Sequence, residues 1–178
     1  MKYRERNEVQ RWLFRRELED LAGREVFYLD ECGVEHRLYQ EYGRAPRGER
    51  LYAEVAGSRR HRTSIIAVSQ NARLVAPFVF EGSCNTEVVD TYFEKVLLPA
   101  LPRGSVIVLD NASFHQSPST QKLVDAAGGE WLFLPTYSPA LNPIEHLWAK
   151  LKAALRRILP DSHNPTLSIS NMCKCYAS

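Results

Sequence analysis

The feature that most constrains the fold is the regular alternation of apolar runs and helical patterns in the second half of the chain. The runs "SVIVLD" (105–110) and "WLFLP" (131–135) have the length and composition of buried strands. Residues 119–127 and 143–158 carry apolar side chains at helical spacing. Strands that alternate with helices in this way pair in parallel, and their helices cover both faces of the sheet.

The first half adds strands that pair differently. "EVFYLDE" (25–31) is a short apolar strand, and two further strands at 63–69 and 74–80 are joined by the turn-prone residues 70–73. Strands joined by such tight turns pair antiparallel. We therefore expect an α/β fold with a mixed five-stranded sheet and helices on both faces.

Helical patterns frame this sheet. Residues 88–97 have helical spacing and end before Pro99, and a leading helix is expected at 2–21. The arginine-rich segment 33–60 is expected to be an irregular insertion, and the tail after Pro160 carries little signal. These patterns predict an N-terminal helix in 1–24, one domain at 25–158 and a C-terminal tail at 159–178. The leading helix has one apolar stripe, formed by Val9, Trp12, Leu13, Leu18 and Leu21.

Composition favours a single globular domain. The chain has 178 residues, of which 44% are hydrophobic and 25% charged, enough to bury a core. We find neither a run long enough to cross a membrane nor the apolar block of a secretory signal, and we expect a cytoplasmic protein. The cysteines form no CxxC pair and are interpreted as reduced structural thiols, with Cys173 and Cys175 giving only a weak indication of metal binding.

Basic residues gather in two places although the net charge is only +2. A solvated surface would explain either cluster alone, but two clusters favour binding to a polyanion such as nucleic acid. One cluster lies between Tyr42 and Arg62 and the other on the last helix. The residues that we expect to contact DNA are Arg44, Arg47, Arg50, Arg59, Arg60, Arg62, Lys152 and Arg156.

Three acids stand where strands or helices begin or end. Asp30 follows the apolar "VFYL", Asp110 follows "VIVL", and Glu145 opens the last helix. If the strands of the two aspartates are neighbours, both emerge at one edge of the sheet, and the last helix can bring the glutamate to them. Carboxylates that converge repel one another unless a cation lies between them, so the three predict a Mg²⁺ site. A single Asp in such a place is more often a turn residue.

Glu145 has a second interpretation as a helix cap. Asn142 suits the N-cap, Pro143 the first helical position and Glu145 the third. At about 100° per residue, Glu145 lies on the same border of the helix as the cations Lys152 and Arg156. The capping and functional roles are compatible, because the cap fixes the direction of Glu145. The stripe expected to be buried comprises Ile144, Leu147, Trp148, Leu151, Leu155 and Ile158.

The motifs "YLDE" (28–31), "VLDNASFH" (108–115) and "YSPALNPIEHLWAKLK" (137–152) together resemble those of DDE transposases. The likeness is to the bacterial insertion-sequence branch of the mariner superfamily and covers roughly residues 25–157. The resemblance implies a ribonuclease H-like fold for the domain at 25–158.

The same resemblance assigns roles to individual residues. Asp30, Asp110 and Glu145 become the catalytic, metal-binding triad for two Mg²⁺ ions, with Mn²⁺ as a substitute. Glu31 lies on the opposite face of its strand and is not expected to be a ligand. Further positions that match the family, in supporting places, are Asn111, His115, Tyr137, Ser138, Pro139, Asn142 and Pro143.

The activity implied is DNA strand cleavage and strand transfer at insertion-sequence ends, with a TA-containing target. The alternatives are a ribonuclease H-like nuclease without strand transfer, an inactive DNA-binding remnant of a transposase, and an interaction domain with fortuitous acids. Family members usually carry a helix-turn-helix region, so we expect a separate or upstream one, and a homodimer. Such a protein acts on double-stranded DNA, associated with the nucleoid.

Overall fold

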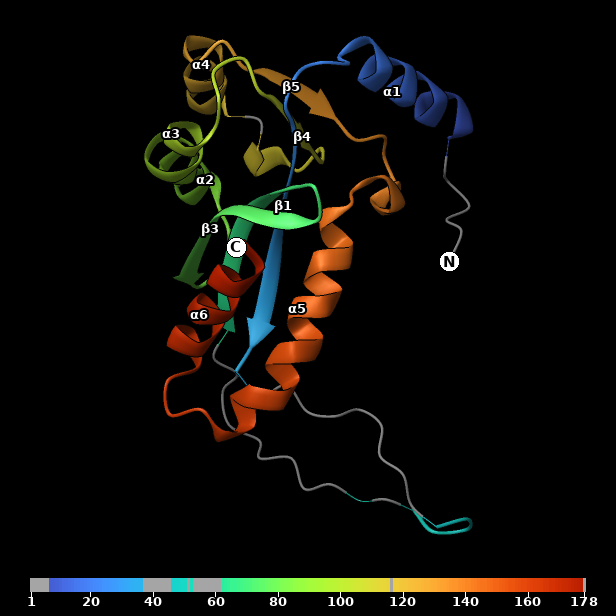
Figure 1. The fold of residues 1–178 in the computed structure, drawn as a ribbon, viewed down its shortest axis with the longest axis vertical. Helices are drawn as coiled ribbons and strands as arrows, with labels where there is room; N and C mark the ends of the chain where they lie inside the picture. The colour runs from blue at the N-terminus through green and yellow to red at the C-terminus, as the bar shows by residue number, and fades with distance from the viewer. Residues whose placement is uncertain (1–6, 37–45, 51, 53–61, 116, 178) are drawn as a thin grey trace.

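The computed structural model describes residues 7–36, 46–50, 52, 62–115 and 117–177. Its sheet has five strands in the order β3-β2-β1-β4-β5 (Figure 1). β1 pairs antiparallel with β2 and β2 with β3, whereas β4 pairs parallel with both β1 and β5. The predicted mixed five-stranded sheet is therefore confirmed. The strands are β1 (Val26–Glu35), β2 (Arg62–Gln70), β3 (Arg73–Glu81), β4 (Val106–Leu109) and β5 (Glu130–Phe133).

The helices agree with the sequence prediction in order and differ from it in detail. The helix expected at 88–97 is divided into α2, a π-helical turn η1 and α3, and the tail forms a helix that was not predicted. Among the described residues, none of the helices has the length and apolar character that crossing a membrane requires. The helices are α1 (Glu8–Asp20), α2 (Thr86–Tyr92), η1 (Phe93–Leu97), α3 (Leu98–Ala100), η2 (Ser113–His115), α4 (Pro118–Ala126), η3 (Pro139–Leu141), α5 (Ile144–Ile158), η4 (Leu159–Asp161) and α6 (Pro165–Ala177).

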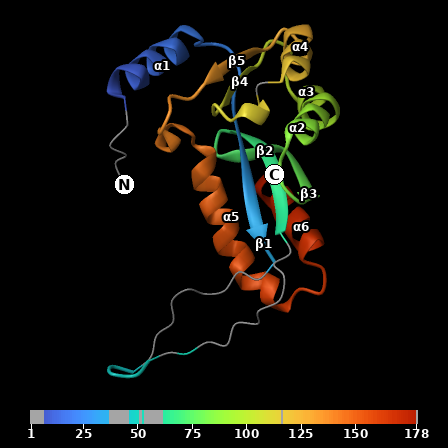
Figure 2. The same ribbon diagram turned by 180° about the vertical axis from the view of Figure 1, so that it is seen from behind.

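Each face of the sheet has its own apolar core. On β1, the two-residue period sends Phe27 and Leu29 toward α2 and η1, and sends Cys32 and Val34 toward α5 and α6. Helices thus cover both faces, as predicted, and the view from behind (Figure 2) shows α5 running alongside β1. This alternation matters for the site, because neighbouring residues of β1 serve opposite sides of the sheet.

The stripe predicted for the N-terminal helix is wrong in part. Phe14 is buried, and Leu18 and Leu21 pack with it against the apolar side chains of β4 and β5. These positions lie three and four residues apart and form the face that the sheet covers. The residues of the predicted stripe that are instead mostly exposed are Val9 (67%), Trp12 (57%) and Leu13 (52%).

The C-terminal segment is part of the core. α6 packs against β3 and α5, and it buries Ile169 and Cys173. Ile158, expected in the buried stripe of α5, is 39% exposed, and the next residue, Leu159, is buried in its place. The helix ends at Ile158 and the chain turns into η4, which changes the direction of the following side chains. On α6, Cys173 is buried and Cys175 exposed, so the two thiols do not converge on one metal.

Candidate active site at the end of two parallel strands

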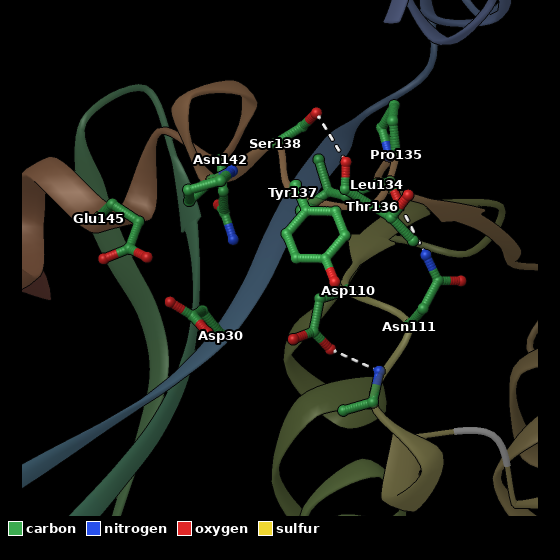
Figure 3. Close-up of a pocket in the computed structure, with 12 residues that line it drawn as sticks. Asp30, Asp110, Asn111, Leu134, Pro135, Thr136, Tyr137, Ser138, Asn142 and Glu145 are labelled. Atoms are coloured by element: carbon green, nitrogen blue, oxygen red, sulfur yellow. Dashed lines mark hydrogen bonds between the residues drawn. The ribbon is translucent and has the colours of Figure 1, made fainter. Parts of the chain in front are cut away.

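The three acids line one pocket. Tyr28 on β1 pairs with Val108 on β4, and two residues further along each strand come Asp30 and Asp110. Asp110 directly follows β4, whereas Asp30 lies within β1, which continues to Glu35 instead of ending at 31 as expected. Together with Glu145, both aspartates line a pocket of about 360 Å³ (Figure 3). Residues far apart in the sequence therefore meet at the end of the parallel pair.

Asn142 fixes the start of α5 relative to β1. Its Oδ1 accepts a hydrogen bond from the backbone N–H of Ile144 at 3.3 Å, and its Nδ2 donates to the carbonyl of Leu29 at 3.3 Å. The helix begins at Ile144, one residue later than predicted, with Pro143 in the capping position. Because Leu29 precedes Asp30, this side chain ties the helix that carries Glu145 to the strand that carries Asp30.

Asp30 lies in a partly buried, negatively charged place. Trp148 Nε1 donates a hydrogen bond to its Oδ2 at 3.1 Å. Burial, followed by the charges of Glu145 and Glu31, raises the pKa of Asp30 from 3.8 to about 7. Trp148 lies in the buried stripe of α5, as predicted, but the bond from its indole N–H to the acid was not predicted. A carboxylate with this environment gains most from a nearby cation.

Asp110 is more open and is held in its ionised form. Its Oδ1 accepts hydrogen bonds from the backbone N–H of Ala112 at 2.9 Å and from His115 Nδ1 at 2.8 Å. The hydrogen bond from His115 is the main reason why the pKa of Asp110 lies below its usual value. The neighbouring Asn111 donates from Nδ2 to the carbonyl of Leu134 at 2.7 Å and so joins the ends of β4 and β5.

His115 is buried between two carboxylates. Its Nδ1 faces Asp110 and its Nε2 is hydrogen-bonded to Glu31 Oε1. Burial alone would lower the pKa of His115, but the two carboxylates raise it to about 9. Glu31 lies on the opposite face of β1 from Asp30, as predicted from the strand period, and it does not line the pocket. Its contact with His115 was not predicted.

The loop before α5 forms the far wall of the pocket. Tyr137 has a left-handed backbone, with φ of 55°, and its side chain is 56% exposed. Figure 3 shows its ring pointing into the pocket between the acids and Asn111. Ser138 and Pro139, which also match the resemblance, line the same wall. A non-glycine residue held in this conformation at a pocket is typical of a functional loop.

None of the basic residues that the structure describes lines this pocket. Arg44, Arg59 and Arg60 fall outside the described residues. Arg47, Arg50, Arg62 and Arg156 are exposed, and Lys152 is half-buried. Lys152 contacts Cys32, a close neighbour of Asp30 on β1. The role of these arginines and of Lys152 as DNA contacts stays a prediction.

The donor set of the pocket suits a hard divalent cation. Carboxylate oxygens are the ligands that Mg²⁺ takes in proteins, and burial together with the negative charges of Glu145 and Glu31 raises the pKa of Asp30. Within the described part of the chain, however, no three His, Cys, Asp or Glu side chains are gathered closely enough to form a complete cage. Asp30, Asp110 and Glu145 are the carboxylates that line the pocket and are therefore its candidate ligands.

The order of the strands and the helices on both faces of the sheet match the ribonuclease H-like fold expected from the motifs. Residues 25–164 match the model of the DDE superfamily endonuclease family, and the chain belongs to this family. Among proteins with curated descriptions, none matches the sequence.

Solved structures share the fold at low sequence identity. The catalytic domain of Mos1 mariner transposase has a TM-score of 0.66 at 17% identity, over 100% of this chain and 85% of that one. A Mos1 mariner paired end complex with Mn has a TM-score of 0.76 at 18% identity, over 100% of this chain and 58% of that one. An intasome of simian T-cell lymphotropic virus with PP2A regulatory subunit B56 gamma has a TM-score of 0.55 at 14% identity, over 86% and 46%. The chain thus spans 57% of the first Mos1 transposase structure that it matches.

Proposed function

We propose that this chain is the catalytic domain of a transposase that cuts DNA and transfers strands at the ends of an insertion sequence. The observation that carries the proposal is the meeting of Asp30, Asp110 and Glu145 in one pocket at the end of β1 and β4. Membership of the DDE superfamily endonuclease family supports DNA as the substrate. Similarity to Mos1 structures with transposon ends and in strand transfer supports the joining step.

The three acids are proposed to hold divalent ions, Mg²⁺ in the cell and Mn²⁺ as a substitute. When bound, two such ions activate the attacking water or 3′-hydroxyl and stabilise the leaving oxygen. The protein supplies position. Asn142 fixes the helix of Glu145 against β1, Trp148 holds one oxygen of Asp30, and Ala112 holds one oxygen of Asp110.

DNA is proposed to reach the pocket across the basic side of α5. Arg156 is exposed and Lys152 half-buried on this helix, and the exposed Arg47 and Arg50 precede β2 in the chain. These side chains can bind phosphates without reading sequence. We infer that recognition of terminal repeats needs a helix-turn-helix region, that the active form is a homodimer, and that the enzyme joins ends to TA-containing targets at the nucleoid.

A strand-transfer assay tests this function. The protein, together with the helix-turn-helix region that reads the repeat, is incubated with Mg²⁺, supercoiled target DNA and a labelled duplex in which flanking DNA follows the element's terminal repeat. We expect a cut at the end of the repeat followed by a labelled joint product. The matched control is Glu145→Gln, which keeps the shape of the side chain and removes its charge. If the variant cuts as well as the wild type, Glu145 serves only the helix start.

A nuclease that cuts without joining is the second candidate, since the same acid arrangement serves hydrolysis. Such a nuclease would cleave an intact duplex, but it would form no joint product from DNA that is supplied with its 3′-hydroxyl ends already cut. Supplying pre-cut ends separates the two functions, because a transposase then needs only its joining step.

A further inference from the structure

Three hydrogen-bonded side chains form a row that leads inward from the pocket. Asp110, His115 and Glu31 lie in line, with His115 Nδ1 2.8 Å from Asp110 Oδ1 and His115 Nε2 hydrogen-bonded to Glu31 Oε1. Exposure falls sharply along it, because the side chain of Asp110 is 55% exposed, that of Glu31 16% and that of His115 only 1%. Of these three side chains, only Asp110 lines the pocket.

Backbone geometry brings the members together. Strand alternation sends Asp30 to the α5 side of β1 and Glu31 to the side of α2. After β4 the chain turns at Ala112 into η2, and this turn places the His115 ring between the side chains of Asp110 and Glu31. Asp30 thus lines the pocket directly, whereas the adjacent Glu31 is connected to it from the other side of the sheet through His115.

The surroundings of Glu31 show that a carboxylate there is costly without a partner. The Glu31 charge adds to burial in raising the pKa of Cys84 and of Tyr92, which are neighbours on that face. Both belong to the apolar core under α2. A charge in such a place is retained only where it is paired. Glu31 is hydrogen-bonded to Cys84 and to the His115 ring, and of these two only the ring also holds Asp110.

The arrangement fixes which oxygen of Asp110 is available. A carboxylate only accepts hydrogen bonds, so each ring nitrogen of His115 donates to the carboxylate that it faces. Among the described residues, both donors to Asp110, the Ala112 N–H and the ring, bind Oδ1. Oδ2 is therefore left for a ligand. Glu31 is bonded to the second nitrogen of the same ring and so helps to fix the orientation in which His115 donates to Oδ1.

We propose that Glu31 is a positioning residue that acts through His115 to hold Asp110 with Oδ2 presented to a divalent ion. The proposal rests on the proposed function of the pocket as a metal site. Glu31 itself contacts neither metal nor DNA. Partners one step removed from a metal ligand set its orientation, and their loss typically weakens metal binding about 10- to 100-fold.

Metal binding by the free protein tests this independently of DNA cleavage. Mn²⁺ is titrated into metal-free wild type, Glu31→Gln, Glu31→Ala and Asp110→Asn, and bound Mn²⁺ is measured by electron paramagnetic resonance. We expect the dissociation constant to rise about tenfold in Glu31→Gln and further in Glu31→Ala. Glu81→Gln, the same change at an exposed site on β3, is the control and leaves binding unchanged. Thermal unfolding of each variant confirms that it is folded, and Glu31→Gln keeps the side-chain volume in case Glu31→Ala does not fold.

A double-mutant cycle tests the path through His115. If Glu31 acts through the ring, Glu31→Gln has no further effect on Mn²⁺ affinity in a His115→Asn background. Equal affinities of wild type and Glu31→Gln would overturn the inference and leave the proposed function intact. Additive losses would show that Glu31 acts without His115. Absence of Mn²⁺ binding by the wild type would refute both the inference and the metal site on which it rests.

Discussion

The two aspartates of the pocket have opposite surroundings. Asp30 is half-buried beside two other acids, and its pKa is raised to about 7, while Asp110 is more exposed and its pKa is lowered by His115. Trp148 on α5 holds the first, and His115 with the Ala112 N–H holds the second. One side of the pocket is therefore short of positive charge, and the other is already compensated. A cation that enters the pocket gains most at Asp30 and meets an oriented ligand in Asp110.

Loss of either aspartate is expected to have the same large effect on cleavage despite this difference. Asp30→Asn and Asp110→Asn should each lower the cleavage rate by at least about a thousandfold, or about 4 kcal/mol, because each removes a metal ligand. DNA affinity should stay near the wild-type value, since neither residue is a phosphate contact. Single-turnover cleavage and duplex binding are measured side by side. A variant that keeps a tenth of the wild-type rate would remove that residue from the triad.

Metal identity should separate binding from chemistry. Mg²⁺ and Mn²⁺ should support cleavage, whereas Ca²⁺, which is larger and looser in coordination, should bind without supporting it. Gel assays with each ion and with excess chelator measure this. Cleavage in the presence of chelator would contradict a metal-dependent mechanism.

The stability of the metal-free protein should distinguish the two aspartates by sign. The pKa of Asp30 is raised from 3.8 to about 7, so the folded state binds more protons than the unfolded one in this interval. The free energy of unfolding thus falls as pH rises through it. At pH 8, Asp30→Asn should stabilise the protein by about 1–2 kcal/mol, less than the whole pKa difference implies because the pocket is open to water.

Asp110 should behave in the opposite way. Its lowered pKa gives a stabilising contribution that is present above the ordinary pKa and is lost as pH falls through the folded value. Asp110→Asn should therefore destabilise the protein at pH 8. Thermal unfolding with chelator measures both variants, with the exposed Asp161→Asn as the control. A shift of both aspartate variants in the same direction would contradict the contrast between the two sites.

The smallest effect concerns the basic side of α5. Arg156→Gln should weaken duplex binding a few-fold and reduce the slope of log affinity against log salt by about 1, equally for end-containing and scrambled DNA. Arg103→Gln, an exposed arginine in the loop before β4, is the matched control. An unchanged salt slope would remove Arg156 from the DNA-binding surface.

The sequence predicted the sheet, the order of its strands and helices, and the acids, because these depend on local apolar periods and on short motifs. Two failures have a common cause. The exposed face of α1 and the burial of α6 depend on which side of each helix meets the sheet. The apolar stripe predicted for α1 is broader than the face that the sheet covers, and the tail that forms α6 carried little signal. Tertiary packing buries Phe14 on α1 and Ile169 on α6.

The site was only partly predictable for a different reason. The strand period placed Glu31 opposite Asp30, and the motif included His115, yet nothing local indicates that the two side chains meet. They lie 84 residues apart and come together only when β1 and β4 are paired. The indole N–H of Trp148 is a similar case, since its apolar ring explains its place in the stripe and conceals its bond to Asp30.

The most direct measurement is a crystal structure of the protein with Mn²⁺, with the ion located by its anomalous scattering. We expect a peak within coordination distance of Asp30, Glu145 and the Oδ2 atom of Asp110, while Oδ1 of Asp110 stays bonded to His115. No peak in this pocket, at a Mn²⁺ concentration that supports cleavage, would contradict the assignment of these acids as the metal site.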